Sequence, residues 1–334
     1  MTQTALGASI GAVFRPKLGR GAILFGGLCG AIPDIDVLFD GGDAWVSLVT
    51  HRGWTHSLFW LTLAAPVFGF VASRIAGKRE FWTWTHLAFW ALATHTLLDW
   101  CTPYGTQLLL PFTNARYAID AVAVIDPFYT LPLLCAVFAG LLPWTSARWT
   151  RRLAASALIL STGYLVLGYA QSRYALSLAE PQLRQSGFEP VEARATPTFF
   201  NLFLRRIVAR DAEGDIAVGM VSTLAPRPIE FVYFDTPDDP LVDRALASPR
   251  GRIMHWFAMR MISAEVERRE DGATVWLTDR RYGLITRPEA SPFGARAEFD
   301  AAGRLIEVRR AGRGDPRGVR RELSAMWRMI FEGS

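Results

Sequence analysis

The chain has 334 residues, of which 51% are hydrophobic, and a net charge of +5. Its charges are unevenly spread: residues 1–170 carry 11 basic and 8 acidic side chains, whereas residues 171–334 carry 25 and 23. This composition excludes a disordered chain and a simple soluble enzyme, because the first half resembles a membrane-embedded region. The arginines are interleaved with acids, so we expect no nucleic-acid partner. The three cysteines are too widely spaced for a disulfide framework or a cysteine-based zinc site.

Six apolar stretches follow one another in the first half of the chain. They are Ala5–Phe14, Gly21–Phe39, Ser57–Ala76, Phe81–Trp100, Phe128–Trp144 and Leu153–Ala170. The last four are each close to the roughly 20 residues that cross the hydrocarbon core of a bilayer. The second contains several glycines and a proline, and the first is short enough to be a half-helix instead of a span. The sequence therefore predicts a multi-pass α-helical membrane domain.

Basic residues are concentrated in alternate connections between these stretches. Nine lie in three connections: Arg15, Lys17, Arg20, Arg74, Lys78, Arg79, Arg148, Arg151 and Arg152. The other connections hold only Arg52 and Arg116. Because basic loops stay in the cytoplasm, we expect the loops around residues 40–56 and 101–127, and the chain after Ala170, to be extracytoplasmic.

Side chains that can bind a metal gather at the predicted outer ends of the spans. They are Asp34 and Asp36, His51 and His56 on either side of Gly53, His95 and Asp99, and the lone Asp126. Two of them, His95 and Asp99, are four residues apart and so share one helix face. Imidazoles and carboxylates are ligands of zinc and related divalent ions, and ionisable groups at membrane depth are functional candidates. We interpret these seven residues as one metal site that opens outward.

Each part of this constellation also has a structural interpretation. The two aspartates after Pro33 can be an interfacial helix cap, the two loop histidines ordinary surface residues, and the His95–Asp99 pair a buried hydrogen bond. For Arg52 the alternatives are neutralising an anionic substrate group, pairing with Asp34 or Asp36, or remaining a solvated loop charge.

The second half of the chain shows short β-rich runs separated by turn signals. Predicted strands are Phe199–Ala209, Ile216–Leu224, Ile229–Phe234, Thr274–Leu277, Ala295–Phe299 and Leu305–Val308, and predicted helices are Asp239–Ala247, Arg252–Met261 and Arg320–Phe331. This is an α+β pattern rich in antiparallel strands. We therefore expect a transmembrane helical domain over residues 1–170, a linker or helical extension over 171–195, and an extracytoplasmic α+β domain over 196–334.

The motifs of the first half resemble one known family. The order Pro-Asp-Ile-Asp, His-Arg-Gly-Trp-Thr-His-Ser, Thr-His-Thr-Leu-Leu-Asp-Trp, Thr-Pro-Tyr-Gly-Thr and Ile-Asp-Pro is similar to that of the YdjM/YbcI-like inner-membrane proteins, a LexA-regulated group of metal-dependent hydrolases. The resemblance covers roughly residues 1–170 and continues more loosely at Pro197–Leu224. A weaker similarity is to zinc-dependent phospholipase C and P1-type nucleases.

This resemblance implies an inner-membrane location, a divalent metal and hydrolase activity. Matched motif by motif, it implies the metal ligands Asp34, Asp36, His51, His56, His95 and Asp99. Many members of the family have Thr-His near the N-terminus, where this chain has Thr2-Gln3. Either Gln3 therefore ligates through its carbonyl, or the site has one ligand fewer.

We expect a metal-bound water to attack an ester, either a phosphoester or a lipid ester, at the outer membrane surface. The expected metal is zinc, as one or two ions. The catalytic residues would be Asp34 or Asp126 as the proton acceptor, with Arg52 as an anion-binding group. The bilayer and a lipid or amphiphilic ester are the expected partners. The alternatives are metal handling or transport without hydrolysis, and a scaffold in which the metal only ties helices together.

Overall fold

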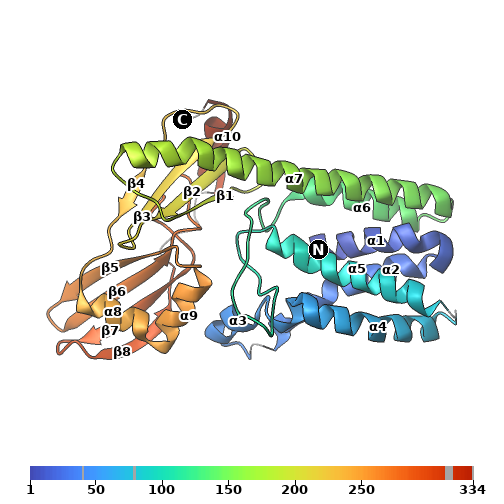
Figure 1. Cartoon of the computed structure of the whole chain (residues 1–334), viewed down its shortest axis with the longest axis horizontal. Helices are drawn as coiled ribbons and strands as arrows, with labels where there is room; N and C mark the ends of the chain where they lie inside the picture. The colour runs from blue at the N-terminus through green and yellow to red at the C-terminus, as the bar shows by residue number, and fades with distance from the viewer. Residues whose placement is uncertain (40, 78–79, 313–318, 333–334) are drawn as a thin grey trace. The chain divides into compact units, whose positions relative to one another are not determined.

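The computed structural model describes residues 1–39, 41–77, 80–312 and 319–332 (Figure 1). Lys78 and Arg79, which belong to one predicted basic connection, lie outside these residues. The chain divides into two compact units, here called the N-terminal unit (Met1–Tyr169 with Phe199–Asn201) and the C-terminal unit (Ala170–Thr198 with Leu202–Ser334). The first contains helices with candidate membrane spans and the second contains two antiparallel sheets, so the predicted fold class is confirmed.

The N-terminal unit is a helical bundle (Figure 1). Its elements are α1 (Thr2–Leu18), α2 (Gly21–Ala31), the 3₁₀ helix η1 (Ile32–Leu38), α3 (Ala44–Thr50), the 3₁₀ helix η2 (Trp54–His56), α4 (Leu58–Ile75), α5 (Phe81–Trp100), α6 (Pro127–Leu141) and the start of α7 (Ala147–Gln185). Among the described residues, three segments are long and apolar enough to cross a membrane, namely Gly21–Leu38, α4 and α7. α6 is a shorter apolar helix. Apolar side chains such as Leu63 and Val67 are more than half exposed on α4, as contact with lipid requires.

The first apolar stretch forms α1, a continuous helix of 17 residues, which is at the lower end of the range for spanning helices. It packs against α2, α5 and α6. Glycines permit its close contact with α2, because a Cβ on Gly7 would lie 2.2 Å from the carbonyl oxygen of Gly26. No residue other than glycine fits there without moving the two backbones apart.

Hydrogen bonds show that the connections alternate between the two ends of the bundle. At one end Arg15 donates to the carbonyl of Thr145 (2.7 Å), which joins the α1–α2 and α6–α7 connections. At the other end the Thr2 and Thr130 hydroxyls are 2.9 Å apart, near the starts of α1 and α6. The basic α1–α2 and α6–α7 connections therefore lie at the end opposite the metal-binding motifs, where Gln3 near the start of α1 contacts Asp99, as the sequence predicts. Which end faces the cytoplasm stays a prediction.

The C-terminal unit holds two four-stranded antiparallel sheets in which neighbours in sequence are neighbours in space. The first sheet is β1 (Glu192–Pro197), β2 (Leu204–Arg210), β3 (Ile216–Ser222) and β4 (Val232–Phe234), and the second is β5 (Ile262–Arg269), β6 (Gly272–Asp279), β7 (Gly294–Asp300) and β8 (Leu305–Arg310). The helices are α8 (Pro240–Ala247), α9 (Pro249–Phe257) and α10 (Val319–Glu332). The second half of α7 packs small side chains, such as Ala175 and Ala179, against Ile207 of the first sheet. The predicted linker or helical extension over residues 171–195 thus begins as the end of one long helix, which stops at Gln185, and its last residues already belong to β1.

Two of the eight described strands, β1 and β5, lie outside the predicted strands. β1 contains arginine and proline and has no apolar residue larger than alanine, so its pairing with β2 defines it as a strand. Helix α9 begins earlier than predicted, at Pro249, because the Ser248 hydroxyl accepts a hydrogen bond from the backbone NH of Gly251 at 3.0 Å and caps it.

Candidate metal centre

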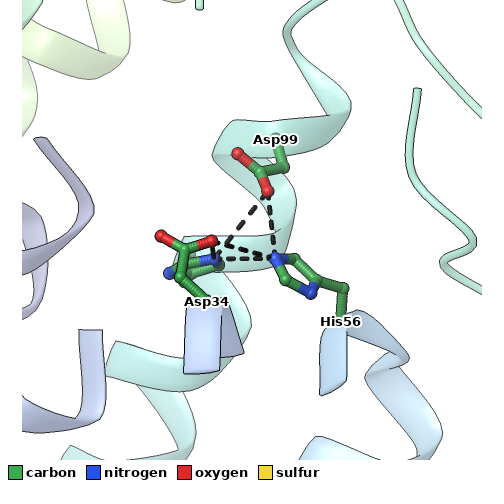
Figure 2. A group of neighbouring side chains, drawn as sticks. Asp34, His56 and Asp99 are labelled. Carbon is green, nitrogen blue, oxygen red and sulfur yellow. Dashed lines mark hydrogen bonds and ion pairs between the residues drawn. The ribbon is translucent and has the colours of Figure 1, made fainter. Parts of the chain in front are cut away.

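Four side chains from separate segments converge at one end of the bundle. Asp34 comes from η1, His56 from η2, and His95 and Asp99 from successive turns of α5. One ligand atom from each lies within 4.8 Å of all the others, so the four could hold a metal ion. Figure 2 shows Asp34, His56 and Asp99 directed toward a common point. His56, His95 and Asp99 are fully buried, whereas the Asp34 side chain is 42% exposed.

The spacing of the ligand atoms matches a metal coordination shell. The Nε2 atoms of His56 and His95 are 3.0 Å apart, and Asp34 Oδ1 lies 3.5 Å from each. Asp99 Oδ2 is 3.2 Å from His56 Nε2 and 3.8 Å from His95 Nε2. Ligands that bind zinc tetrahedrally at roughly 2.0–2.1 Å are about 3.3 Å from one another. The observed distances bracket that value.

Hydrogen bonds on the far side of each ring fix which imidazole nitrogen carries the proton. His95 Nδ1 is 2.8 Å from the carbonyl oxygen of Gly30, which only accepts, so Nδ1 donates and Nε2 of a neutral ring is bare. His56 Nδ1 lies 3.0 Å from the Thr55 hydroxyl, which gives its own proton to Asp36 and therefore accepts from Nδ1, so the same arrangement holds for His56. When both rings are neutral, two bare nitrogens therefore face each other beside two carboxylates in a buried space. Either a proton on one ring or a metal ion relieves this repulsion between lone pairs.

Asp36 orients this centre from outside it. Its carboxylate accepts hydrogen bonds from His51 Nδ1 (2.9 Å), the Thr55 hydroxyl (2.9 Å) and the backbone NH of Arg52 (3.0 Å). A carboxylate behind a ligating histidine is the usual arrangement that fixes the ring and strengthens it as a ligand. The structure thus places Asp36 and His51 beside the four-residue cluster, and neither is a member of it.

Arg52 is buried and pairs with Asp99. Its Nε lies 3.1 Å from Asp99 Oδ2, and its Nη1 donates to the Thr102 hydroxyl at 2.8 Å. The guanidinium also lies over the Tyr104 ring, 4.7 Å from its centre. The residue has a φ of 61°, an uncommon conformation for a non-glycine, and the loop bonds to its backbone hold it there. Arg52 therefore neutralises a cluster carboxylate, whereas the sequence left open pairing with the two aspartates of η1.

One oxygen of the cluster has no hydrogen bond. Asp99 Oδ2 is completely buried and accepts none from the residues that the structure describes, although Arg52 and His56 carry atoms at ion-pair distance. Arg52 compensates the charge of this oxygen, and because no described residue donates a hydrogen bond to it, its lone pairs are available to a metal ion. The donor set, its distances and this oxygen all fit a divalent ion.

Without a metal, the same carboxylates retain a proton on His56. Burial on its own disfavours the charged imidazolium, but hydrogen bonds to Asp34, Asp36 and Asp99 outweigh it and raise the pKa of His56 to about 10. A metal ion would take the place of this proton.

Asp126 and Gln3 lie next to the cluster in a different role. Asp126 caps α6, where its Oδ1 accepts from the backbone NH of Phe128 at 2.9 Å, and its Oδ2 accepts from the Tyr164 hydroxyl at 2.9 Å. It contributes no atom to the four-residue cluster. Gln3 donates through Nε2 to Asp99 Oδ1 at 2.9 Å, so it supports a cluster residue from the side opposite Arg52.

The irregular segment between α5 and α6 holds the histidine loop in place, and the sequence alone did not identify its role. Gln107 donates from its side chain to the Val49 carbonyl (2.8 Å) and from its backbone NH to the Arg52 carbonyl (3.0 Å). Arg116 is buried and donates to the Gly105 carbonyl at 2.7 Å. The signal in the sequence that could have indicated this role is the presence of polar residues inside an otherwise apolar connection.

Comparison with known proteins places these motifs in a family context. Residues 1–175 match the model of the YdjM inner membrane protein family. The chain is 30% identical over 148 residues to the uncharacterized protein YfhP of Bacillus subtilis (strain 168), which covers 41% of this chain and 44% of YfhP. It is 31% identical over 153 residues to the inner membrane protein YbcI of Escherichia coli (strain K12), which covers 43% of this chain and 88% of YbcI. No solved structure matches.

Proposed function

The chain belongs to the YdjM inner membrane protein family, and from this membership and the geometry of its Asp/His cluster we propose that it is a membrane-bound, metal-dependent hydrolase. The observation that carries the proposal is the convergence of two imidazole Nε2 atoms, 3.0 Å apart, with two carboxylates at the spacing of metal ligands. Either a proton on His56 or a metal ion compensates the negative charge gathered there, and imidazole with carboxylate is a ligand set of zinc. Both second nitrogens are held by acceptors, as in metalloenzyme sites.

The proposed metal is zinc, held by Asp34, His56, His95 and Asp99. When bound, it would supply a Lewis acid and an activated water for attack on an ester. Asp34 has one oxygen in the cluster and is the exposed member of the four, so water reaches the centre on its side. Its other oxygen is the proposed proton acceptor. Arg52 is fully engaged with Asp99 and Thr102, which favours a positioning role over substrate binding.

Exposed apolar side chains around the centre favour a lipid or amphiphilic substrate. Leu38 and Phe39, at the end of η1, are each 73% exposed, and Trp54, two residues before His56, is 57% exposed. The Trp54 and Trp60 rings pack 5.4 Å apart. Exposed tryptophans are typical of the membrane–water interface. With basic connections at the opposite end, we propose that the centre lies at the outer surface of the inner membrane.

Two other functions use the same ligands. A metal-handling or transport protein would carry ionisable groups near the bilayer midplane, whereas the present cluster lies at one end of the bundle. A purely structural ion would tie η1, η2 and α5 together without turnover. Hydrolysis is favoured over both because Asp34 keeps one side of the cluster open to water.

The test uses detergent-purified full-length protein. We expect stoichiometric zinc by elemental analysis in the wild type, background levels in His56→Ala and His95→Ala, and wild-type levels in His86→Ala, an exposed histidine on α5. A panel of phosphoesters and carboxyl esters should then be hydrolysed by the wild type and not by the two metal-free variants. Unchanged metal content in both variants would refute the site. Metal uptake into proteoliposomes without ester turnover would refute the hydrolase in favour of transport.

A further inference from the structure

A small pocket adjoins the metal centre on its protein side. Its wall includes Gln3, Asp99, Thr102, Asp126 and Tyr129, together with small apolar side chains of the α5–α6 connection such as Ala123. Asp99 therefore belongs to both sites: Oδ2 faces the cluster, whereas Oδ1 accepts the Gln3 amide. None of the residues lining the pocket is basic. A group bound in the pocket would thus lie directly beside a group bound at the cluster.

Asp126 is the charged group in this pocket without a countercharge. It is only 4% exposed, and its contacts within the described residues are two backbone NH groups and the Tyr164 hydroxyl, all neutral. The start of α6 contributes a partial positive charge, which is smaller than a full one. A buried carboxylate without a cation is costly, and a bound cation would compensate it.

The other polar groups of the pocket also favour a ligand that donates hydrogen bonds. Gln3 donates its amide to Asp99, which leaves its carbonyl oxygen as an acceptor. The Thr102 hydroxyl donates to the Asp99 carbonyl at 2.8 Å and accepts from Arg52. Because acceptors predominate and the net charge is negative, a phosphate or carboxylate would be repelled. An ammonium group supplies both the donors and the charge that the pocket lacks.

We propose that this pocket binds a positively charged primary amine and selects, among esters, those that carry an ammonium group next to the scissile bond. The selection among esters rests on the proposed hydrolase function, whereas the binding of the amine does not. A zwitterionic head group, with its phosphodiester at the cluster and its ammonium at Asp126, is the substrate class that satisfies both sites.

Binding is tested first, with ethylammonium chloride as the probe and thermal unfolding of the detergent-solubilised full chain as the readout. Saturating ethylammonium should raise the Tm of the wild type by at least about 2 °C over equal sodium chloride, while sodium acetate and ethanol should not. The shift should disappear in Asp126→Asn and in Ala123→Leu, which fills the pocket. It should persist in Asp43→Asn, a matched substitution at the cap of α3, and in metal-free His95→Ala, which excludes amine binding to the metal.

Two results would overturn the pocket assignment. One is an ethylammonium shift no larger than that of sodium chloride in the wild type, and the other is an undiminished shift in Ala123→Leu. Ala123→Leu leaves the α6 cap intact, so the second result is decisive even if Asp126→Asn fails to fold.

Turnover is tested second, with dihexanoyl phosphatidylethanolamine and dihexanoyl phosphatidylglycerol. We expect kcat/KM to favour the ethanolamine lipid by about tenfold or more in the wild type. Hydrolysis of both lipids at equal rates without an ethylammonium shift would refute the pocket and leave the hydrolase standing. An Asp126-dependent shift with no ester hydrolysed would support the pocket and refute the proposed function.

Discussion

Both units of the molecule bury charged side chains, but they satisfy them differently. In the C-terminal unit Arg280 and Arg281 are fully buried at the end of β6. Arg281 donates through Nε and Nη2 to the two carboxylate oxygens of Asp279 at 3.0 and 2.6 Å. Arg280 donates to the Ser263 hydroxyl and to Glu265, and lies 3.6 Å from the centre of the Phe234 ring. In these contacts of Arg280 and Arg281 donors meet acceptors and opposite charges meet, as a stabilising network requires.

In the N-terminal unit the buried groups do not match one another. Two imidazoles and two carboxylates converge, and the positive charges beside them within the described residues are Arg52 and, without a metal, the proton on His56. The comparison teaches that burial of charge alone does not mark a functional site. A functional site is indicated when more acceptors than donors converge on one point, because a cation from outside the chain can bind there.

The largest expected effect comes from removing a cluster imidazole. His95→Ala should weaken metal binding by more than the roughly 10–100-fold typical of residues behind the ligands, because it deletes a direct ligand. Competition with a chelator on purified protein measures this loss. The C-terminal unit should be unaffected by this substitution. A loss of its β-sheet signal in circular dichroism alongside the loss of metal would show that the two units do not respond independently.

The next effect concerns the closed network of the C-terminal unit. Arg281→Met leaves the buried Asp279 carboxylate unpaired and should lower the free energy of unfolding by about 3–5 kcal/mol, with no change in metal content. Denaturant titration followed by circular dichroism provides the value. The double variant with Asp279→Asn should recover part of the loss. If the single variant loses metal instead, the network is not merely structural.

A smaller effect is expected from Asp36, which stands behind His56. Asp36→Asn keeps the size of the side chain but weakens its hold on the His56 ring, and should reduce metal affinity by roughly 10–100-fold. Chelator competition again gives the number, with Asp43→Asn as the control. A loss as large as that of His95→Ala would mean that Asp36 is itself a ligand.

The smallest effect is expected for an exposed ion pair. Arg268 lies 2.6 Å from Asp239, and its side chain is 67% exposed. Arg268→Ala should therefore change the free energy of unfolding by less than about 1 kcal/mol, in the same titration as Arg281→Met. A cost near that of Arg281→Met would show that burial does not distinguish the two pairs.

The sequence predicts the helical part of the fold well, because apolar stretches and basic connections are local signals. It predicts the sheets less completely. β5 begins with Ile262 but ends in the charged run Glu-Arg-Arg, so its identity as a strand depends on pairing with β6. Such pairing is non-local and has no signature within the strand itself.

The candidate centre shows a similar division. The four-residue spacing of His95 and Asp99 places both on one face of α5, and the structure brings both to the cluster. The roles of Asp34 and Asp36 could not be separated, because this depends on η1 being a 3₁₀ helix. With three residues per turn, positions two apart point about 240° apart. Asp34 therefore faces the two imidazoles, while Asp36 faces the histidine loop.

The origin of the ligands also constrains how the centre is built. Asp34, His56 and Asp99 come from three segments spread over 66 residues, and the carbonyl that orients His95 belongs to α2. No two consecutive helices emerging from a ribosome would provide all four of the candidate metal ligands. A metal ion held by this cluster would therefore have to bind after insertion of α5, and it would come from the ion pool of the compartment that Asp34 faces.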